Sequence, residues 1–385
     1  MAFPLPESNP EALGLDPRPL ERMCAVIERH IAEGHHPGAQ VAVARNGRLA
    51  LFRSFGTARV APEGARDGDA GGRPADARSL FLMYSNTKVV TAAAVWMLVE
   101  DGLLRFSDTV AGHVPEFAAN GKGEITVLQL LTHQGGFPSA VVPEACWEDH
   151  ALLRKTVSNF TLEWTPGSKV RYHPAAAHWV SAVLIEAITG MDFRAFIRDR
   201  ITAPLGLADE VFVGLPAGQL DRAADIYDPK VDGGYVPRAG ENTAAHHAAG
   251  IPGGGGYGSA RGMAAFYQML AAGGALNGAR VLAPRTIEFV TRNFTGDRID
   301  EYMGLPMCRG IGPHSRGEHP VARGLGTIAH PRTFGHGGVG SSYCWADPAS
   351  GASFAFFSNC RQTEEFHNRR MDVISSLAHM SILPA

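Results

Sequence analysis

The sequence lacks any apolar run long enough to cross a membrane. No uninterrupted apolar stretch reaches about 18 residues, the length typical of a transmembrane helix. Residues 1–8 contain neither the basic segment nor the apolar segment that marks a secretory leader. We therefore expect no membrane partner and no export, which makes the cytoplasm the expected location.

An excess of positive charge is also lacking. The 35 Lys and Arg residues are outnumbered by 38 Asp and Glu residues, which leaves a formal net charge of −3. The basic residues are mostly arginines and are scattered, whereas a nucleic-acid-binding surface concentrates them on one face. We expect no nucleic-acid partner.

Cysteine is scarce, and its placement does not suit a disulfide framework. The five cysteines are odd in number and far apart: Cys24, Cys146, Cys308, Cys344 and Cys360. Such spacing favours free thiols in a reducing compartment. The sequence also has no His-Glu-x-x-His and no Cys-x-x-Cys motif, so we expect no metal ion.

The sequence matches a dinucleotide-binding motif in its glycine spacing only. Gly253, Gly255 and Gly258 fit the pattern G-x-G-x-x-G. However, no predicted strand precedes them, and no acidic residue follows about 20 positions later, where a ribose would be bound. We therefore expect no cofactor.

The elements that are present predict an α+β protein. A helix is expected at residues 17–34, a hairpin around Asn46-Gly47, a polar loop at 61–78, a short helix capped by Thr126, helices at 175–189 and 193–201, a helix after Ser259, and a C-terminal hairpin followed by a helix at about 364–380. Strands cluster at the two chain ends and helices lie between them. This order predicts an antiparallel sheet formed by both ends, residues 1–80 and 281–385, with flanking helices and an inserted, mostly helical lobe, residues 81–280. The active site is expected in the cleft between the two lobes.

Ser85 and Lys88 begin a stretch that is apolar on nearly every side as far as residue 99. Residues i and i+3 are neighbours on one helix face, so the lysine amine is expected beside the serine hydroxyl. Burial disfavours the charged ammonium and favours a neutral amine that can accept a proton. The pair therefore suits a nucleophile and its base, although a capping serine followed by a solvent-seeking lysine is the simpler alternative.

Two further segments carry candidate functional groups. Tyr172 follows the Pro166-Gly167 turn and precedes an alanine-rich helix, where its hydroxyl can face a cleft. His336, Gly337 and Gly338 stand at the start of the C-terminal hairpin. Glycines in a strand allow a ligand or another backbone to approach closely.

As a set, these segments resemble the three-motif signature of the serine β-lactamase and penicillin-recognising family. The motifs are Ser85-x-x-Lys88, Tyr172, and His336-Gly337-Gly338, and the resemblance extends from about residue 15 to 380. It is strongest to the class C branch and to the esterases called family VIII carboxylesterases. It implies the β-lactamase-like fold, with the sheet from both chain ends described above.

The resemblance also implies a role for each residue. Ser85 would be acylated, with Lys88 and Tyr172 as its proton-transfer partners. The backbone N–H groups of Ser85 and Val339 would form the oxyanion hole, a role that agrees with a helix start and a glycine-rich strand. His336 and its two glycines would bind the substrate, and His173, beside the second motif, is a further candidate for this.

Two departures from the class C pattern narrow the expected substrate. Pro174 stands where class C β-lactamases have an asparagine, so a lactam side chain loses its amide partner. His336 replaces the usual lysine, whose charge helps to hold a substrate carboxylate. Both changes favour a small-molecule carboxylic ester of a small to medium acyl group over lactams and peptides.

Other functions of the same residues stay open. An acyltransferase, an amidase, a peptidase or a weak β-lactamase would use the same nucleophile, and a scaffold that only binds a ligand is a remaining alternative. The pocket walls are expected from loops at 137–160, 214–258 and 305–330, whose shapes the sequence does not give. The oligomeric state is not predicted.

Overall fold

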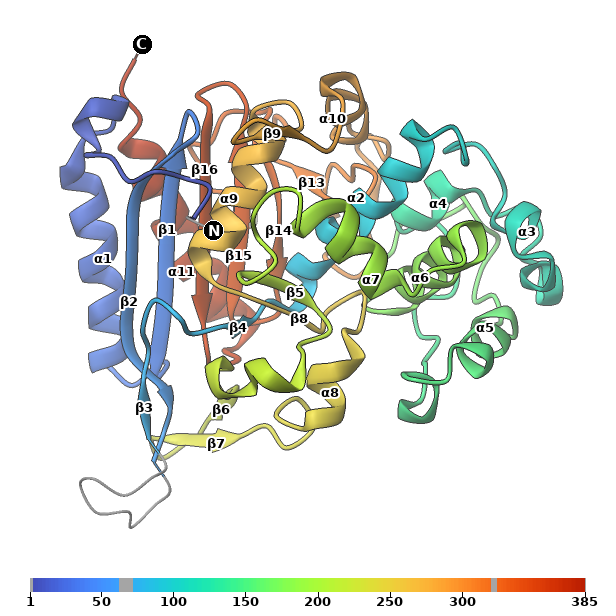
Figure 1. Cartoon of the computed structure of the whole chain (residues 1–385), viewed down its shortest axis with the longest axis horizontal. Helices are drawn as coiled ribbons and strands as arrows, with labels where there is room; N and C mark the ends of the chain where they lie inside the picture. Colours follow the sequence, from blue (N-terminus) through green and yellow to red (C-terminus); the bar gives the residue numbers. More distant parts are fainter. Residues whose placement is uncertain (1–2, 62–71, 320–323, 385) are drawn as a thin grey trace.

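The computed structural model describes residues 3–61, 72–319 and 324–384, and it confirms the α+β class. A seven-stranded antiparallel sheet has the order β13-β14-β15-β16-β1-β2-β3 (Figure 1). Most of the loop expected at residues 61–78 lies outside the described residues.

The strands of this sheet are β1 (Gly38–Arg45), β2 (Arg48–Arg59), β3 (Arg73–Pro74), β13 (His314–Ser315), β14 (Phe334–Gly338), β15 (Ser342–Asp347) and β16 (Ala352–Ser358). The short remaining strands are β4 (Phe81–Leu82), β5 (Val211–Val213), β6 (Tyr227–Pro229), β7 (Tyr235–Pro237), β8 (Gly256–Gly258), β9 (Ala275–Leu276), β10 (Ala279–Arg280), β11 (Ile299–Asp300) and β12 (Leu305–Pro306). The α-helices are α1 (Pro17–Ala32), α2 (Thr87–Glu100), α3 (Val110–His113), α4 (Val127–Leu131), α5 (His150–Ser158), α6 (Ala176–Thr189), α7 (Phe193–Ile197), α8 (Ala244–Ala249), α9 (Ala260–Ala271), α10 (Pro284–Val290) and α11 (Glu364–Met380).

The two ends of the chain meet in the middle of the sheet. Strand β1 pairs with β2 on one side and with β16 on the other, and Val43 lies opposite Phe354. The β1–β2 hairpin turns at Asn46 and Gly47, which both have the positive φ that a tight hairpin turn requires. The predicted sheet from both chain ends is therefore confirmed.

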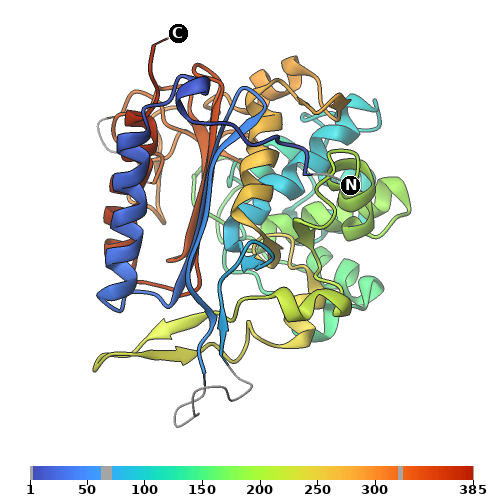
Figure 2. The ribbon, with the colours of Figure 1, turned by 60° about the vertical axis from the view of Figure 1, so that its left-hand side comes forward.

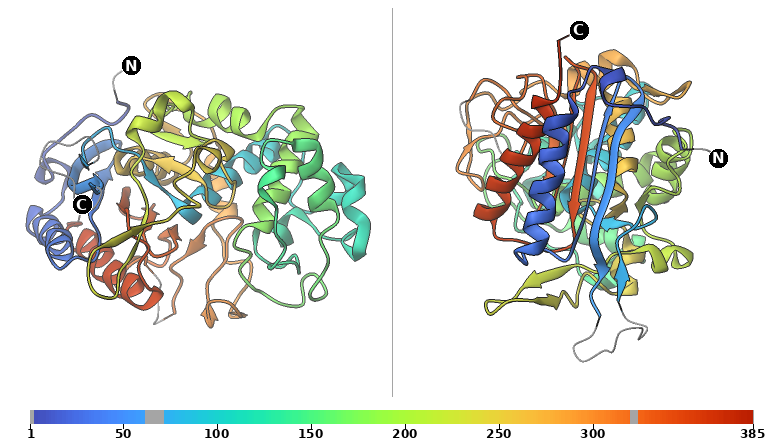
Figure 3. Two further views of the ribbon diagram at one scale, coloured as in Figure 1. Left: turned by 90° about the horizontal axis from the view of Figure 1, so that it is seen from below. Right: turned by 90° about the vertical axis from the view of Figure 1, so that its left-hand side faces the viewer.

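Alternate residues of these strands face two different helical layers. Val41 and Val43 belong to the cluster beneath α1 and α11, whereas Ala42 and Ala44 face the cluster that contains α9. Because side chains alternate along a strand, one strand serves both layers. Figure 2 shows α1 and α11 on one side of the sheet and α9 on the other, and Figure 3 shows α1 and α11 side by side.

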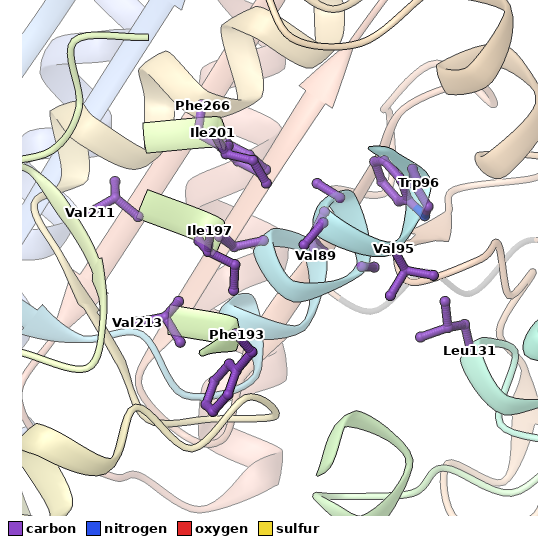
Figure 4. Packing of buried hydrophobic residues seen from close by; sticks show 14 of the residues in the cluster. Val89, Val95, Trp96, Leu131, Phe193, Ile197, Ile201, Val211, Val213 and Phe266 are labelled. Carbon is purple, nitrogen blue, oxygen red and sulfur yellow. The ribbon is translucent and has the colours of Figure 1, made fainter. Parts of the chain in front are cut away.

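Helix α2 is the central element of the helical region. Every residue from Thr87 to Leu98 is buried, as the sequence predicted. Figure 4 shows Val89 and Val95 among side chains of neighbouring elements, and Trp96 donates a hydrogen bond from Nε1 to the Ile311 carbonyl at 2.9 Å. Helix α2 is thus held by packing along most of its length.

Other predicted helices are confirmed with small shifts in their ends. Thr126 caps α4 in a capping box with Gln129, and Ser259 caps α9 by accepting from the Gly262 N–H. Residues 214–258, expected as loops, also contain α8 and strand β8. The glycine-rich β8 has no apolar alternation, and its strand form depends on pairing with β4 and β5.

The boundary between the two predicted lobes remains a prediction. Helix α9 lies inside the range 81–280 but packs on β1, β15 and β16 of the sheet. In the described part of the chain no helix is both long and apolar enough to cross a membrane. All five cysteines are free thiols and buried.

Candidate active site

Ser85 lies in a strained turn directly before α2. It is the middle residue of a 3-10 turn, Tyr84–Asn86, and Tyr84 has a φ of 44°, which is uncommon for a residue with a side chain. Ser342 of β15 accepts a hydrogen bond from Asn86 Nδ2 at 2.9 Å and donates one to the Met83 carbonyl at 3.0 Å. The sheet therefore holds both sides of the turn that presents Ser85.

Lys88 points its amine at the serine. Nζ lies 3.1 Å from Ser85 Oγ, 2.6 Å from the Pro174 carbonyl and 2.5 Å from the Gly253 carbonyl. The proline that replaces the expected asparagine thus contributes its carbonyl to Lys88. The glycine run set aside as a nucleotide motif contributes another.

The surroundings of Lys88 disfavour its charged form. The side chain is 0% exposed, and its three neighbouring acceptors carry no formal charge. Burial, with a smaller contribution from the Arg309 cation, holds the pKa of Lys88 well below its usual value. A neutral amine donates two hydrogens to the carbonyls and keeps a lone pair for the Ser85 proton.

Tyr172 completes the group around Ser85. Its hydroxyl donates to Ser85 Oγ at 2.8 Å, so Oγ lies between the phenol and the amine. Burial raises the pKa of Tyr172, and the phenol is therefore protonated at rest. The structure brings together the three residues that the motifs predicted.

A buried ion pair behind Tyr172 was not found by sequence reasoning. Arg309 donates to Asp300 Oδ2 from Nη2 at 2.6 Å and from Nε at 3.1 Å, and both side chains are buried. Asp300 Oδ1 accepts from the Tyr172 backbone N–H at 3.0 Å, while the Arg309 guanidinium lies 5.0 Å from the tyrosine ring centroid. The pair both positions Tyr172 and places a cation beside its ring.

The third motif lies on β14, next to the Ser85 turn. A Cβ on Gly338 would collide with the Met83 carbonyl and with Tyr84 Cβ, so the close approach of the two segments requires glycine. His336 is buried with Nδ1 2.8 Å from the Gly337 carbonyl, and burial holds the pKa of His336 well below its usual value. The imidazole is therefore neutral.

These segments enclose a small cavity of about 130 Å³. The lining includes six of the predicted site residues: Ser85, Tyr172, His336, Gly337, Gly338 and Val339. Other residues of the lining include Tyr302, Met303, Met307, Gln362, Glu364 and Asn368. A larger groove of about 850 Å³, between α10 and the strand β14, contains none of the predicted catalytic residues. We assign the candidate site to the smaller cavity, because Ser85 and Tyr172, two of the residues predicted to be catalytic, line it.

His173 lies behind the site and does not line this cavity. Its Nε2 accepts from the Phe137 N–H at 3.1 Å, and its Nδ1 lies 2.7 Å from the Arg171 carbonyl. Both ring nitrogens thus have backbone partners, so we leave His173 out of the proposed substrate-binding group. In this geometry the ring links the backbone at Phe137 to the backbone at Arg171, directly before Tyr172.

One cluster in the described residues offers three atoms that could hold a metal ion: His150, Glu186 and Asp192. Arg194 donates to Asp192 Oδ2 at 2.7 Å and also reaches Glu148. The guanidinium meets the negative charge of this cluster, which forms an ion-pair network and contributes no residue to the lining of the cavity around Ser85.

Comparison with known proteins gives the family. The sequence matches the β-lactamase family over residues 24–378. It is 28% identical over 320 residues to a protein of Mycobacterium tuberculosis named "Esterase/beta-lactamase LipL", covering 75% of this chain and 71% of that one. A putative D-alanyl-D-alanine carboxypeptidase of Escherichia coli K12 is 26% identical over 386 residues, covering 92% of this chain and 85% of its relative.

A solved structure gives the same result for the fold. The crystal structure of a family VIII carboxylesterase superimposes with a TM-score of 0.81 at 26% sequence identity, covering 95% of this chain and 98% of the other. The chain therefore belongs to the β-lactamase family of serine hydrolases and has the β-lactamase fold.

Proposed function

We propose that this protein is a serine esterase that hydrolyses small to medium carboxylic esters through an acyl-enzyme on Ser85. The observation that carries the proposal is the position of Ser85 Oγ, 3.1 Å from a buried lysine amine and 2.8 Å from a buried phenol. A hydroxyl between a base and an acid suits acyl transfer by a covalent intermediate.

In acylation Lys88 accepts a proton and Tyr172 donates one. Lys88 takes the Ser85 proton as Oγ attacks the ester carbonyl, and a tetrahedral oxyanion forms. When the intermediate collapses, Tyr172 gives its proton to the departing alcohol oxygen. This step leaves the acyl-serine, an ammonium on Lys88 and a phenolate on Tyr172, and the Arg309 cation beside the ring stabilises the phenolate.

Deacylation restores each proton. The Tyr172 phenolate takes a proton from the water that attacks the acyl carbonyl. Lys88 then returns its proton to Ser85 Oγ as the carboxylic acid leaves. The cycle consumes one ester and one water, and it ends with neutral Lys88, Ser85 and Tyr172.

The backbone N–H groups of Ser85 and Val339 are the proposed oxyanion donors. Ser85 and Val339 line the same cavity, and Gly338 packs against the turn that carries the serine. Donors fixed on a strand end and a helix start need no rearrangement as charge develops on the substrate oxygen.

Two features of the site support an ester over a lactam or a peptide. His336 is neutral and buried, so the third motif offers no charge to a substrate carboxylate. Pro174 has no side-chain amide, and its carbonyl is used by Lys88. One relative is named an esterase and another a putative carboxypeptidase, so the test must include both kinds of substrate.

The test compares the wild type with Ser85→Ala on p-nitrophenyl butyrate, a chromogenic cephalosporin and a D-alanyl-D-alanine peptide. We expect rapid ester cleavage that disappears in the variant and little cleavage of the other two substrates. Faster cleavage of the cephalosporin or the peptide would overturn the ester assignment. A product formed with added alcohols in place of free acid would identify an acyltransferase.

A further inference from the structure

Helix α11 places a buried arginine behind the proposed oxyanion hole. Arg370 is 2% exposed, and its guanidinium has four acceptors. It donates to the Gly340 carbonyl at 2.8 Å and to Ser358 Oγ at 3.0 Å from Nη2, to His367 Nδ1 from Nε, and to His36 Nδ1 from Nη1. None of these four acceptors carries a formal negative charge.

Two aromatic rings also lie near the guanidinium of Arg370. The guanidinium lies 5.4 Å from the Phe356 ring centroid and 5.5 Å from that of Phe366. Because arginine only donates, His36 and His367 each accept with Nδ1, which leaves the proton of each ring on Nε2 and keeps the rings neutral. A buried cation without a carboxylate is costly, and it is most useful where a negative charge appears transiently.

Arg370 acts on the turn at residues 339–341, which links β14 to β15 directly after the third motif. The Gly340 carbonyl accepts from Arg370 and from the Gln362 N–H at 3.0 Å. The next carbonyl, that of Ser341, accepts from the Ser358 N–H at 2.8 Å and from Ser358 Oγ at 3.0 Å. Gly340 and Val339 line the cavity that contains Ser85, so this network fixes the backbone of the proposed oxyanion donor.

We propose that Arg370 is a positioning residue for acyl transfer. Its side chain holds the 339–341 turn so that the Val339 N–H faces the substrate oxygen. Its guanidinium also places a positive charge, with no carboxylate among its hydrogen-bond partners, behind this turn. This inference rests on the proposed function. The charge on the oxygen develops only in the transition state, so the effect belongs to kcat and not to the binding of a neutral ester.

The first test uses Arg370→Met and Arg370→Lys on p-nitrophenyl butyrate. We expect Arg370→Met to lower kcat by about tenfold or more with KM changed less than about threefold, because an indirect contribution is smaller than that of a direct oxyanion donor. Arg370→Lys, which keeps the charge but loses the fork of donors, should recover part of kcat. An unchanged kcat in a folded Arg370→Met variant would overturn the proposal.

Arg45 offers a matched control. It is also a buried arginine, 7% exposed, and it donates to the carbonyls of Leu13, Gly14 and Ser350. None of these acceptors lines the cavity around Ser85. We expect Arg45→Met to lower the melting temperature while leaving kcat unchanged, and an equal loss of kcat in both variants would make the effect of Arg370 merely structural and overturn the proposal.

A transition-state readout separates positioning from substrate binding. The rate of inactivation by a p-nitrophenyl alkylphosphonate, which builds negative charge on its oxygen at Ser85, should fall in Arg370→Met by a factor similar to that of kcat. A higher KM restricted to an ester with a carboxylate, with kcat unchanged, would instead make Arg370 an anion-binding residue and overturn the proposal.

Two further variants keep the test decisive. If Arg370→Met does not fold, Ser358→Ala removes one acceptor of Arg370 and the side-chain donor to Ser341 in the same network. It should lower kcat severalfold with KM unchanged, and an unchanged kcat would count against the proposal.

Wild-type activity in Ser85→Ala would refute the proposed function itself, whereas an inactive Ser85→Ala beside a fully active Arg370→Met would refute only the inference about Arg370.

Discussion

Burial gives Lys88 a chemistry that a solvent-exposed lysine lacks. Its amine is surrounded by two backbone carbonyls and the serine, with no carboxylate among these hydrogen-bond neighbours to favour the ammonium. The nearby Arg309 cation further disfavours a second positive charge. Activity should therefore rise with pH as Lys88 loses its proton, and this rise should be centred below the usual pKa of a lysine.

Arg309→Met should move this rise to higher pH. Removing the cation raises the pKa of Lys88, and the unpaired Asp300 acts in the same direction. A shift of one pKa unit reduces the neutral fraction, and with it kcat/KM on the rising limb, about tenfold. The pH profile of kcat/KM for the wild type, Arg309→Met and Arg309→Lys measures this shift.

Arg309→Lys is the control, because it keeps a cation near Tyr172 and should give a smaller shift. A rising limb at the same pH in the wild type and in a folded Arg309→Met variant would show that Arg309 does not influence the base.

Tyr172→Phe removes the phenol while preserving the ring that packs near Arg309 and His336. The departing alcohol then has no proton donor, and kcat should fall roughly 10²–10⁴-fold. Steady-state kinetics with esters of acidic and less acidic alcohols measure the loss. We expect the larger loss with the less acidic alcohol, and equal losses for both would contradict the assignment of Tyr172 as the acid.

At the scale of elements, the glycine loop before β8 fits closely around Lys88. A Cβ on Gly253 would lie 3.3 Å from Lys88 Nζ and 3.2 Å from the Pro174 carbonyl. A Cβ on the adjacent Gly254 would make only ordinary contacts, the nearest at 3.8 Å from Tyr84. The loop therefore has little room for a side chain at Gly253 and enough room for one at Gly254.

Gly253→Ala should reduce kcat/KM about tenfold or more. The added methyl group displaces either the Lys88 amine or the Pro174 carbonyl that accepts from it, and catalysis depends on the position of the amine relative to Ser85. Gly254→Ala is the matched control and should keep most of the activity. Parallel kinetics and thermal melts of both variants give the result. Similar activity in both would show that the close approach at Gly253 is not important.

The sequence predicted α2, the helices with a capping serine or threonine and the first hairpin, because the residues that indicate each element lie within it or directly beside it. Such local patterns did not identify the Asp300–Arg309 pair, because Asp300 lies in the two-residue strand β11, Arg309 lies outside the named helices and strands, and the two meet only in the folded chain. Arg370 was missed for a different reason. It stands beside Arg369, which is exposed, and only the spacing of His367, Arg370 and Ile374 on one helical face indicates burial.

For the whole molecule, both the fold and the meeting of Ser85, Lys88 and Tyr172 could be predicted from the sequence by resemblance, because the motifs occur as a set. Strand β8 and the walls of the cavity could not, since they depend on contacts between segments far apart in the chain. A position next to a motif residue in sequence does not place a side chain in the cavity. His173 follows Tyr172 in sequence, yet its ring lies behind the cavity.

The packing of the whole chain should also protect its thiols. All five cysteines are free and buried, and burial raises the pKa of Cys24, Cys308, Cys344 and Cys360. A protonated, inaccessible thiol reacts slowly. Titration with a thiol reagent should detect little reaction in the native protein and all five thiols after denaturation. Fast reaction of the native protein with loss of activity would contradict this packing.

Trapping the acyl-enzyme tests whether Ser85 is the nucleophile. The protein is mixed with p-nitrophenyl butyrate, quenched in acid within the first turnovers, and analysed by intact mass and by peptide mapping. We expect a mass increase of one butyryl group on the peptide that contains Ser85, and none in Ser85→Ala. A butyryl group on another residue, or continued ester hydrolysis by Ser85→Ala at the wild-type rate, would show that Ser85 is not the nucleophile.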